Sequence, residues 1–347
     1  MATIDEIARR ANVSKTTVSF VINGKPGVSE ATANLVRAVM AELDYVPSVL
    51  AQRFASRRSM AVALIAQSYP SVFHDPRHAE IVDAVYSTLE DQDYSLVLGT
   101  SNRRFLEERR HIKILRSGQV DGLLLLEPTL DQDYLADLAE QDAPVVIING
   151  EGGHLGLAAV RTNDTAVGRI AAEHLLSLGH RRIGFIDGGR SHQSAIDRAL
   201  EFQRSLAQAG CPLDPRRIFH GEINTSEVTG HHGCRTILER MPDTTAIFCC
   251  NDTMALNALD AAREMNLDVP GRLSLLGVDD HPTSIACRPQ LSSIRQPSYD
   301  IAKEATEMLL TCLQHPRNGN HKPVTRLLPP ALVPRDSTAP PGPMIPC

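Results

Sequence analysis

From Ala61 onward, short apolar runs of strand length alternate with stretches of helical periodicity, and this alternation limits the fold more than any other feature of the chain. A strand that is apolar at every position must be covered on both faces, which is typical of a parallel sheet lined by helices. The apolar runs cover residues 61–66, 95–99, 122–126, 144–149, 183–187, 245–250 and 272–279, and the helical stretches include residues 79–90, 105–116, 167–178, 195–209 and 252–264. About 270 residues of this pattern fit two doubly wound parallel sheets better than one, and they predict an α/β body of two lobes.

The first 45 residues have a different character, because they contain short helical patterns without strands. Thr3 begins a capping box with Glu6, Ser14 precedes a second helix, and Ser29 precedes a third. Pro47 then breaks the pattern. The N-terminal segment is therefore predicted to be a small all-α unit attached to the α/β body.

The net charge also differs between the two segments. The chain of 347 residues carries −6 at neutral pH, but residues 1–58 carry +3 and the remaining residues carry −9. Such asymmetry indicates a basic module on an acidic body, with different partners for the two. The acidic body is expected to be repelled by DNA, so that only the basic module and its linker approach a duplex.

The sequence disfavours several classes of protein. Apolar runs of the ~18 residues that a membrane helix needs are missing, and the N-terminus lacks the blocks of a signal peptide, so a cytoplasmic protein is expected. Seven cysteines without a C-x-x-C pair argue against a disulfide framework, and His231 and His232 lack the second spaced pair of a zinc site. Residues 150–156 miss the third glycine of a dinucleotide motif, and neither a G-x-S-x-G nor a Walker motif is present. We therefore expect no enzymatic activity, metal or cofactor.

The first two helices are joined by a tight turn, as in a helix-turn-helix, whose second helix enters the major groove of DNA. Hydroxyls near the start of that helix are suited to phosphates, and outward-facing side chains are suited to base edges. The candidates for phosphate contacts are Ser14, Thr17 and Ser19, and those for base contacts are Lys15, Thr16 and Phe20. The helix pattern alone fits equally well a polar three-helix bundle with no nucleic-acid partner.

A longer set of motifs separates these alternatives. Residues 3–8 read TIDEIA, residues 13–23 read VSKTTVSFVIN, residues 28–32 read VSEAT and residues 43–47 read LDYVP. This pattern resembles the N-terminus of the lactose-repressor (LacI/GalR) family of bacterial transcriptional regulators. The resemblance continues to about residue 333, through the motifs TND at 162–164, LGHRRI at 178–183, NDTMA at 251–255, LGVDD at 276–280 and IRQP at 294–297.

The resemblance implies a domain organisation and a function. It predicts a helix-turn-helix headpiece over residues 1–46, a hinge helix with linker over residues 47–58, an effector-binding body over residues 59–333 and a disordered tail over residues 334–347. The body would have the fold of type I periplasmic binding proteins, with one lobe from about residues 59–160 and 293–323 and the other from about residues 161–292 and 324–333. Such a protein is a repressor that binds a pseudo-palindromic operator as a homodimer. Its operator affinity is switched by a small effector between the lobes, expected here to be a sugar or sugar phosphate.

Two aromatic residues depart from the usual family pattern. Phe20 stands where Arg is frequent, and it offers bases only an apolar surface, for example to a thymine methyl group. Packing within the headpiece is the alternative role for Phe20. Phe54 stands where the family usually has the Leu wedge that opens the minor groove, and packing on the body is its alternative. The other DNA contacts implied by the resemblance are Thr3, Asn23, Ser29, Ser48 and Ala51.

Ligands of doubly wound sheets bind beyond the carboxyl ends of the strands. Polar residues that follow the predicted strands include Gln67, Tyr69, Asn149, Asn251 and Asp279. The resemblance supports Asn251 and Asp279 and adds Arg198 on a helix, Gln296 on a crossover between lobes, and Phe73 as an apolar wall. The alternatives are structural: Asp279 could cap a loop, Asn251 could cap a helix and Arg198 could form a surface ion pair.

A second function remains open at this point. The body could be a cytosolic sugar-binding protein or an NAD-dependent oxidoreductase, with the N-terminal segment as a regulatory appendage. Operator binding distinguishes the two hypotheses. Aromatic residues make up only 4% of the chain and Trp is absent, so the sequence does not indicate the stacking platform that many sugar and purine sites contain.

Overall fold

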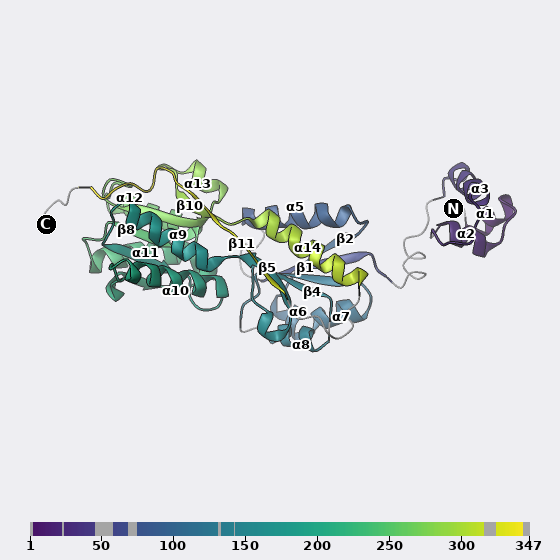
Figure 1. Cartoon of the computed structure of the whole chain (residues 1–347), viewed down its shortest axis with the longest axis horizontal. Coiled ribbons are helices and arrows are strands. Elements are labelled where there is room, and N and C mark those ends of the chain that lie inside the picture. Colours follow the sequence, from purple (N-terminus) through teal and green to yellow (C-terminus); the bar gives the residue numbers. More distant parts are fainter. Residues whose placement is uncertain are drawn as a thin grey trace. The chain divides into compact units, whose positions relative to one another are not determined.

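The computed structural model describes residues 3–22, 24–45, 58–68, 75–130, 133–141, 143–315 and 324–342. The chain forms two compact units, an N-terminal unit of residues 1–60 and a body of residues 61–347 (Figure 1). Each unit has a hydrophobic core of its own.

The N-terminal unit contains three helices, α1 (Ile4–Arg10), α2 (Lys15–Ile22) and α3 (Glu30–Glu42). Each helix contributes a fully buried residue to one core, namely Ile7, Val18 and Val36. The structure thus confirms the predicted all-α N-terminal unit.

The first sheet of the body has six parallel strands in the order β11-β5-β4-β3-β1-β2. The strands are β1 (Ala61–Ala66), β2 (Ser95–Thr100), β3 (Gly122–Leu126), β4 (Val145–Ile148), β5 (Ala158–Thr162) and β11 (Thr325–Leu328). Its helices are α5 (Pro76–Glu90), α6 (Arg103–Glu107), α7 (Arg110–Arg116), α8 (Tyr134–Glu140) and α14 (Ser298–Gln314), with a 3-10 turn at Gly153–Leu155. The helix predicted over residues 105–116 is interrupted, because Arg109 adopts a left-handed backbone conformation (φ 49°) between α6 and α7.

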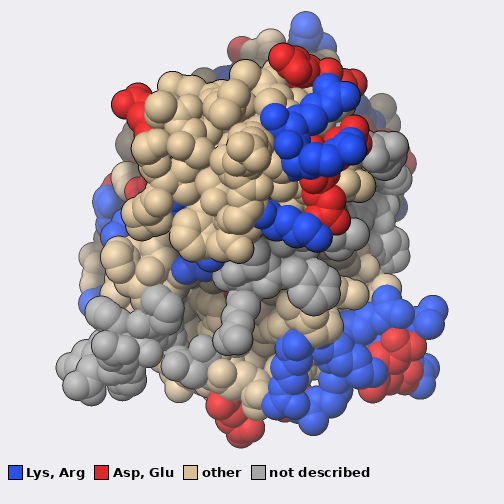
Figure 2. Space-filling view, turned by 90° about the vertical axis from the view of Figure 1, so that its right-hand side faces the viewer, with Lys and Arg blue, Asp and Glu red and all other residues tan. Residues whose placement is uncertain are grey.

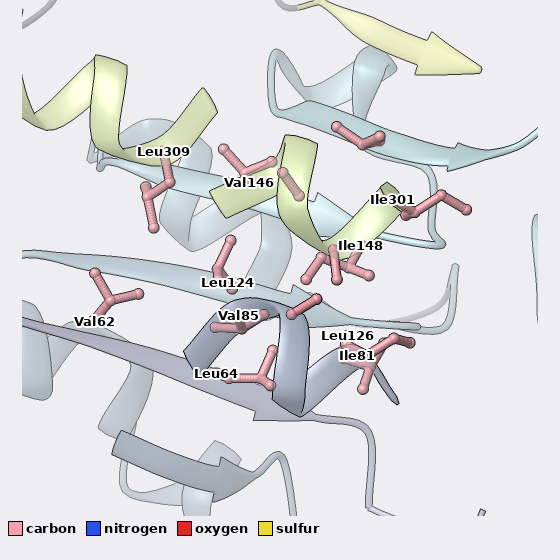
Figure 3. Close-up of a cluster of buried hydrophobic side chains, with 14 of the residues drawn as sticks. Val62, Leu64, Ile81, Val85, Leu124, Leu126, Val146, Ile148, Ile301 and Leu309 are labelled. Atoms are coloured by element: carbon pink, nitrogen blue, oxygen red, sulfur yellow. The ribbon is translucent and has the colours of Figure 1, made fainter. Parts of the chain in front are cut away.

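Successive residues of the buried strands face opposite sides of this sheet. Val62 and Leu64 of β1 pack with residues of α5 and α14, which cover one face (Figure 3). Ala63 and Ile65 pack on the other face, which α6 to α8 cover. Burial on both faces explains why these strands are apolar at every position.

The second sheet has the order β12-β10-β9-β8-β6-β7, and only β12 is antiparallel to its neighbour. The strands are β6 (Ile183–Asp187), β7 (Ile218–His220), β8 (Ala246–Cys249), β9 (Ser274–Asp279), β10 (Ser292–Arg295) and β12 (Ala331–Val333). Its helices are α9 (Asp164–Ser177), α10 (Gln193–Gln208), α11 (Ser226–Arg240), α12 (Asp252–Glu264) and α13 (Pro282–Ala286), with 3-10 turns at Pro215–Arg217 and Ile223–Thr225. Helices α11 and α12 approach closely at Gly230, where a Cβ atom would lie 2.2 Å from the carbonyl oxygen of Met254.

The approximate boundaries predicted between the lobes differ from the observed sheets at three places. Strand β5 extends the first lobe to Thr162, two residues beyond the predicted boundary. Strand β10 belongs to the second sheet, because it pairs in parallel with β9, so the crossover lies after Arg295 and not at residue 293. Strand β11 belongs to the first sheet, because it pairs in parallel with β5, so the chain returns to the second lobe after residue 328. Each lobe therefore needs strands from the C-terminal part of the chain.

The prediction of a disordered tail is wrong for residues 334–342. Ser337 is fully buried, and its backbone N–H donates to the carbonyl oxygen of Gln290 at 2.9 Å. The N–H of Leu275 donates to the carbonyl oxygen of Ser337 at 2.8 Å. Nε2 of His180 lies 2.9 Å from the carbonyl oxygen of Ala339. The segment makes these bonds from a turn at Asp336 and Ser337 and the irregular residues after it, and the prolines on either side do not prevent them. Residues 343–347 lie outside the described part of the chain.

Candidate DNA-binding and effector sites

Hydroxyl side chains cap all three helices of the N-terminal unit. The backbone N–H of Thr17 donates to Oγ of Ser14 at 3.0 Å, and the N–H of Thr32 donates to Oγ of Ser29 at 3.3 Å. Thr3 caps α1 through the N–H of Glu6 at 3.3 Å. Exposed hydroxyls and free N–H groups at helix starts are suited to phosphate oxygens.

The outer face of α2 presents Lys15 and Thr16 to solvent, while Val18 is fully buried. Phe20 is half-buried, and the ammonium of Lys25 lies 5.9 Å from the centre of its ring. The ring borders a surface depression of about 400 Å³ whose lining is rich in hydroxyl groups. The depression is lined by Val13, Ser14, Thr16, Thr17, Phe20, Gly27, Val28, Ser29 and Thr32. Phe20 therefore packs within the unit and also borders an outward-facing surface.

In the body, a cavity of about 430 Å³ lies where the carboxyl ends of the strands of both sheets meet. Both lobes and one crossover contribute to its wall. It is lined by Asp75, Arg77, Glu127, Asn149, His192, Ser194, Arg198, Ile223, Thr225, Ser226, Glu227, Val228, Asn251, Thr253, Asp279, His281 and Gln296.

The wall from the first lobe is a cluster of charges around Arg77. Asp75 caps α5 by accepting from the N–H of Arg77 at 2.9 Å, and its carboxylate also accepts from Nη2 of Arg77 at 2.7 Å. Glu127, directly after β3, accepts from Nη1 of Arg77 at 3.1 Å and lies 3.3 Å from Nε2 of His78. Burial alone would raise the pKa of Glu127, but Arg77 and His78 outweigh it and hold that pKa well below its usual value. The carboxylates of this cluster thus stay ionised despite their burial.

The wall from the second lobe contains an arginine that is held within its own lobe. Nε of Arg198 donates to Asp164 at 2.8 Å and Nη1 donates to the carbonyl oxygen of Cys250 at 2.9 Å. Asn251 accepts from the N–H of Met254 at 2.8 Å and donates to Oγ of Ser226 at 2.8 Å. Arg198 and Asn251 therefore line the cavity with their orientations fixed from behind.

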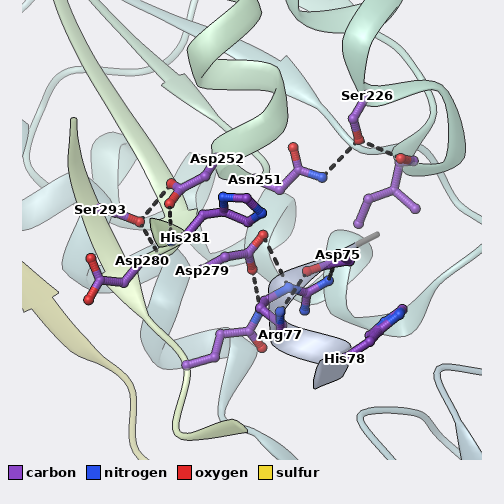
Figure 4. Close-up of polar contacts among 12 residues, drawn as sticks. Asp75, Arg77, His78, Ser226, Asn251, Asp252, Asp279, Asp280, His281 and Ser293 are labelled. Carbon is purple, nitrogen blue, oxygen red and sulfur yellow. Dashed lines mark hydrogen bonds and ion pairs between the residues drawn. The ribbon is translucent and has the colours of Figure 1, made fainter. Parts of the chain in front are cut away.

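Asp279 connects the two lobes across the cavity (Figure 4). It is the last residue of β9 and has a positive φ of 121°, and one of its oxygens lies 3.6 Å from Nε of Arg77 in the other lobe. The amide of Gln296 donates to its second oxygen at 2.5 Å, while Oγ1 of Thr162 donates to Oε1 of Gln296 at 2.7 Å. Burial raises the pKa of Asp279, and Arg77 opposes that rise.

Other contacts between the lobes lie beside the cavity. Nε2 of His192 and Oε1 of Gln67 are 2.9 Å apart, and the N–H of Leu130 donates to the carbonyl oxygen of Ser191 at 3.0 Å. Arg161 also donates to Asp197 of α10 at 2.8 Å. The structure is therefore a closed arrangement of the lobes.

Comparison with known proteins identifies the family. The family described as bacterial regulatory proteins, lacI family, matches residues 3–48, and a periplasmic binding protein-like domain matches residues 172–338. The chain is 33% identical to the HTH-type transcriptional repressor PurR of Escherichia coli O139:H28 over 98% of this chain and 97% of that protein. The chain belongs to the LacI family of bacterial transcriptional regulators.

Further relatives agree with this assignment. The ribose operon repressor of Haemophilus influenzae is 32% identical over 97% of this chain and 98% of that protein. A crystal structure of the lac repressor dimer bound to operator and the anti-inducer ONPF is 28% identical, covers 97% of this chain and 99% of that one, and has a TM-score of 0.82. A complex of the transcriptional regulator CelR with cellobiose is 30% identical, covers 97% and 100% of the two chains and has a TM-score of 0.73. These relatives support a DNA-binding repressor with an effector-binding body, and they do not support the oxidoreductase alternative.

Five of the predicted effector residues of this LacI-family regulator line one cavity: Asn149, Arg198, Asn251, Asp279 and Gln296. Gln67 instead joins the lobes beside it. The surface ion pair considered for Arg198 is wrong, because that residue is only 2% exposed, whereas Asn251 does cap α12 as well as line the cavity. Tyr69 and Phe73 lie outside the described residues, as do Asn23, Ser48, Ala51 and Phe54 of the predicted DNA-binding set.

Several cavity residues of this LacI-family regulator were not predicted from the sequence. Glu127 directly follows a predicted strand, so the rule that found Asn149 also applies to it. Asp75 precedes a proline at a helix start, which is a capping signal. Arg77, His192 and His281 lie on helix starts or loops and had no comparable signal.

The neighbours of two cavity residues have structural roles. Asp252 is buried and accepts from Ser284 and Ser293 at 2.7 Å each. Burial, together with the charge of Asp279, raises the pKa of Asp252 to about 8. Asp280 forms ion pairs with Arg295 and Arg335, which attach the C-terminal segment to the crossover.

Neither a metal centre nor a membrane span is found in the part of the chain that the structure describes. Its His, Cys, Asp and Glu side chains form no group of three that could hold a metal ion. Among the described helices, none combines the length and the apolar character of a transmembrane segment.

Proposed function

We propose that this LacI-family regulator is an operator-binding repressor whose effector is an uncharged polyhydroxylated molecule such as a sugar, and that it acts in the cytoplasm, where its DNA partner is. One observation carries the choice of effector: both guanidinium groups in the cavity wall already have carboxylate partners. Arg77 contacts Asp75, Glu127 and Asp279, and Arg198 contacts Asp164. Each guanidinium of the described cavity wall is therefore already balanced by carboxylate charge, and only Nε of Arg77 is a buried guanidinium donor without a hydrogen-bond acceptor among the described residues.

The balance of charge in the wall disfavours phosphorylated ligands. Asp75, Glu127, Glu227 and Asp279 line the cavity, against the guanidinium groups of Arg77 and Arg198. Two like charges 5 Å apart repel by about 3 kcal/mol at an effective dielectric constant of 20. A phosphate monoester would meet this repulsion from several carboxylates at once, whereas a hydroxyl group would not.

The hydrogen-bonding groups of the wall suit hydroxyl groups, which both donate and accept. Nδ2 of Asn149 is buried and has no hydrogen-bond acceptor among the described residues, so it is a donor for a ligand. Carboxylate oxygens supply the complementary acceptors. The described wall contains no Phe, Tyr or Trp on which a purine ring would stack. Relatives named as a ribose operon repressor and as a complex with cellobiose are consistent with this proposal.

Matched ligand pairs test the proposal. We expect calorimetric titration and thermal shift to detect a neutral sugar within a panel of ribose, glucose, cellobiose, ribose 5-phosphate, glucose 6-phosphate, adenine and hypoxanthine. A ligand at 100 times its dissociation constant adds about 2.7 kcal/mol to stability. Asp279→Ala should abolish this response and retain operator binding. Preference for a phosphate ester or a purine, or no binding by any neutral sugar, contradicts the proposed effector class.

For DNA, we propose that Lys15, Thr16 and Phe20 face the bases, while Thr3, Ser14, Thr17, Ser19 and Ser29 contact phosphates. The exposure of Lys15 and Thr16 on α2 supports this division. The hinge contacts of Ser48, Ala51 and Phe54, and that of Asn23, rest on the family resemblance. Lys15→Ala should cost about 1–3 kcal/mol and relax sequence choice at one position in a binding-site selection. An equal loss for every sequence would make Lys15 a phosphate contact.

We also propose that a second copy of the chain covers the edge of the first sheet at β2. This strand ends the sheet, and Val97 and Leu98 are 39% and 50% exposed, with Tyr86 of α5 at 50%. An exposed apolar edge strand is a surface that proteins normally cover. The lac repressor relative is described as a dimer on its operator, which supports the same assembly here. Leu98→Glu should shift sedimentation toward the monomer, and an unchanged dimer would exclude this surface.

A further inference from the structure

The acidic body contains one strongly basic segment. Residues 103–116 hold six Lys or Arg residues and two Glu residues, a formal charge of +4, whereas the rest of the body beyond residue 58 carries −13. Helices α6 and α7 form this segment. Its charge is opposite to that of the body that carries it.

The basic side chains share the outer face of these helices. His111 and Ile112 of α7 are buried in the first lobe, while Arg110, Lys113 and Arg116 are exposed and follow one another at intervals of three residues. Residues three apart lie on the same face of a helix. Arg103, Arg104 and Arg109 are exposed as well. Figure 2 is turned about the vertical axis from Figure 1, and it shows a dense group of Lys and Arg at the height of α6 and α7.

The acidic partners do not neutralise this face. Glu108 is shared by Arg104 and Arg110, and Arg109 pairs with Asp137 at 2.8 Å. Among the described residues, Arg116 donates only to the neutral side chain of Gln141. Lys113 has no ion pair in the described part of the chain. Exposed ion pairs of this kind contribute about 0–1 kcal/mol, so the arginines can exchange carboxylates for other anions.

Helix α7 ends at the edge of the first sheet where the chain enters the body from the N-terminal unit. Helix α7 ends beside the amino edge of the first sheet, since the chain leads from Arg116 directly into β3. There the N–H of Asp121 donates to the carbonyl oxygen of Ala61 at 2.7 Å. Ala61 is the first residue of the body, so the chain from the N-terminal unit enters at this same edge.

We propose that the basic face of α7, formed by Arg110, Lys113 and Arg116, binds the phosphate backbone of the DNA that flanks the operator. The inference goes beyond the proposed function and requires only its operator binding. The N-terminal unit is covalently joined to the body at this edge, so a duplex bound by that unit is tethered to the body here. Duplex DNA carries one phosphate per about 1.7 Å of axis, which offers a dense row of partners to three cations. These contacts add affinity without sequence preference.

Duplex length and salt provide the test. The full-length protein first selects a pseudo-palindromic site from random DNA, and its affinity is then measured for that site alone and with about 15 base pairs added on each side, or ~50 Å of axis. We expect tighter binding to the extended duplex. The triple variant Arg110→Gln, Lys113→Gln, Arg116→Gln should lose that gain, about tenfold at low salt, and should bind the short duplex like the wild type. The slope of log affinity against log salt should fall by about 0.9 for each phosphate that the variant no longer binds.

A matched control removes the same charge from the other lobe. Arg204 and Arg216 of the second lobe are exposed and Arg235 is half-buried, and they pair with Glu201, Asp214 and Glu239. Their triple Gln variant should keep the gain from flanking DNA. An equal loss in both variants would indicate net charge alone, and an equal loss of the α7 variant on short and long duplexes would indicate damage to operator reading; either outcome overturns the inference. A wild type that binds the site but gains nothing from flanks overturns it and leaves the proposed function intact, whereas no operator binding at all overturns both.

Discussion

Arg198 and Arg77 face the same cavity from opposite lobes, and their partners differ in one respect. Arg198 is 2% exposed, and its partners Asp164 and Cys250 belong to the second lobe, as it does. Arg77 contacts Asp75 and Glu127 of its own lobe and also Asp279 of the other. One guanidinium therefore belongs to the architecture of a lobe, and the other contacts both lobes.

This difference predicts that one arginine mainly affects the stability of the fold and that the other affects closure of the lobes on the effector. An ion pair within one lobe has the same free energy whether the cleft is open or closed, so it cannot favour either state. A contact between the lobes exists only when they are close, and it therefore contributes to closure. Arg198 should consequently control the free energy of unfolding, and Arg77 should control the affinity for the effector.

The largest expected effect is that of Arg198→Met on folding. Removing one partner of a buried ion pair costs up to about 3–5 kcal/mol, and here it leaves Asp164 with only the longer contact to Arg161 at 3.7 Å. Chemical denaturation should detect this loss in the free energy of unfolding. Arg204→Met on the same helix is the control, because Arg204 is 69% exposed and should change stability by less than about 0.5 kcal/mol. A loss below about 1 kcal/mol for Arg198→Met would mean that Arg198 is not a structural residue.

Arg77→Gln should weaken effector binding as well as folding, because Arg77 pairs with carboxylates of both lobes. The variant removes the ion pair with Asp279 and leaves three carboxylates without their guanidinium, so the closed state becomes less favourable. We expect effector affinity to fall about tenfold or more, equivalent to at least ~1.4 kcal/mol, in calorimetric titration of the sugar found in the panel. Arg169→Gln on α9, which removes an exposed pair with Glu173, should change nothing. Unaltered affinity for the Arg77 variant would remove the distinction between the two arginines.

Gln67→Ala tests the same comparison with a smaller interaction. Gln67 and His192 form a hydrogen bond between the lobes, whereas Gln193 bonds to Asp197 within α10. A single hydrogen bond contributes about 0.5–1.5 kcal/mol, so effector affinity should fall by up to about tenfold with little change in stability. Gln193→Ala should leave effector affinity unchanged. The same loss in both variants would show that contact between the lobes is not what matters.

The smallest effects concern two histidines, one in each lobe. Burial lowers the pKa of His78, but Glu127 outweighs it and raises that pKa above its ordinary value near 6.5. Burial lowers the pKa of His180, and the carbonyl oxygen of Ala339 opposes this only in part. The contribution of His78 to stability is therefore complete below about pH 6.5 and is lost as the pH rises through its folded-state pKa. The contribution of His180 to stability is complete above about pH 6.5, and it is lost as the pH falls through the folded-state pKa of His180.

Denaturation at a series of pH values checks this pair of signs. The stability lost in His78→Asn should shrink as the pH rises from about 6 to 8, and the loss in His180→Asn should shrink as the pH falls from about 7 to 5. Slopes of the same sign would contradict the assignment of opposite shifts to the two lobes.

Much of the architecture was predictable because it depends on local pattern. Runs of apolar residues identified β1 and β3, and the rule of carboxyl ends identified Asn149, Asn251 and Asp279. Arg77 was not predictable, because its role depends on a partner 202 positions away that only the closed fold brings near. The sequence also did not predict that β10 belongs to the second sheet or that residues 334–342 are attached to the second lobe. Backbone hydrogen bonds hold both segments there, and such bonds leave little trace in the pattern of side chains.

The return of the chain to both sheets near its end has a consequence for synthesis on the ribosome. The N-terminal unit has its whole core within 45 residues and can fold as soon as they emerge. The first lobe lacks an edge strand until residues 325–328 are made, and the second lacks β12 and the buried Ser337 until shortly afterwards. Folding during translation should therefore finish the DNA-reading part long before either half of the sensor. Nascent chains would reach a stage at which a completed headpiece is attached to a body that cannot yet close on a ligand.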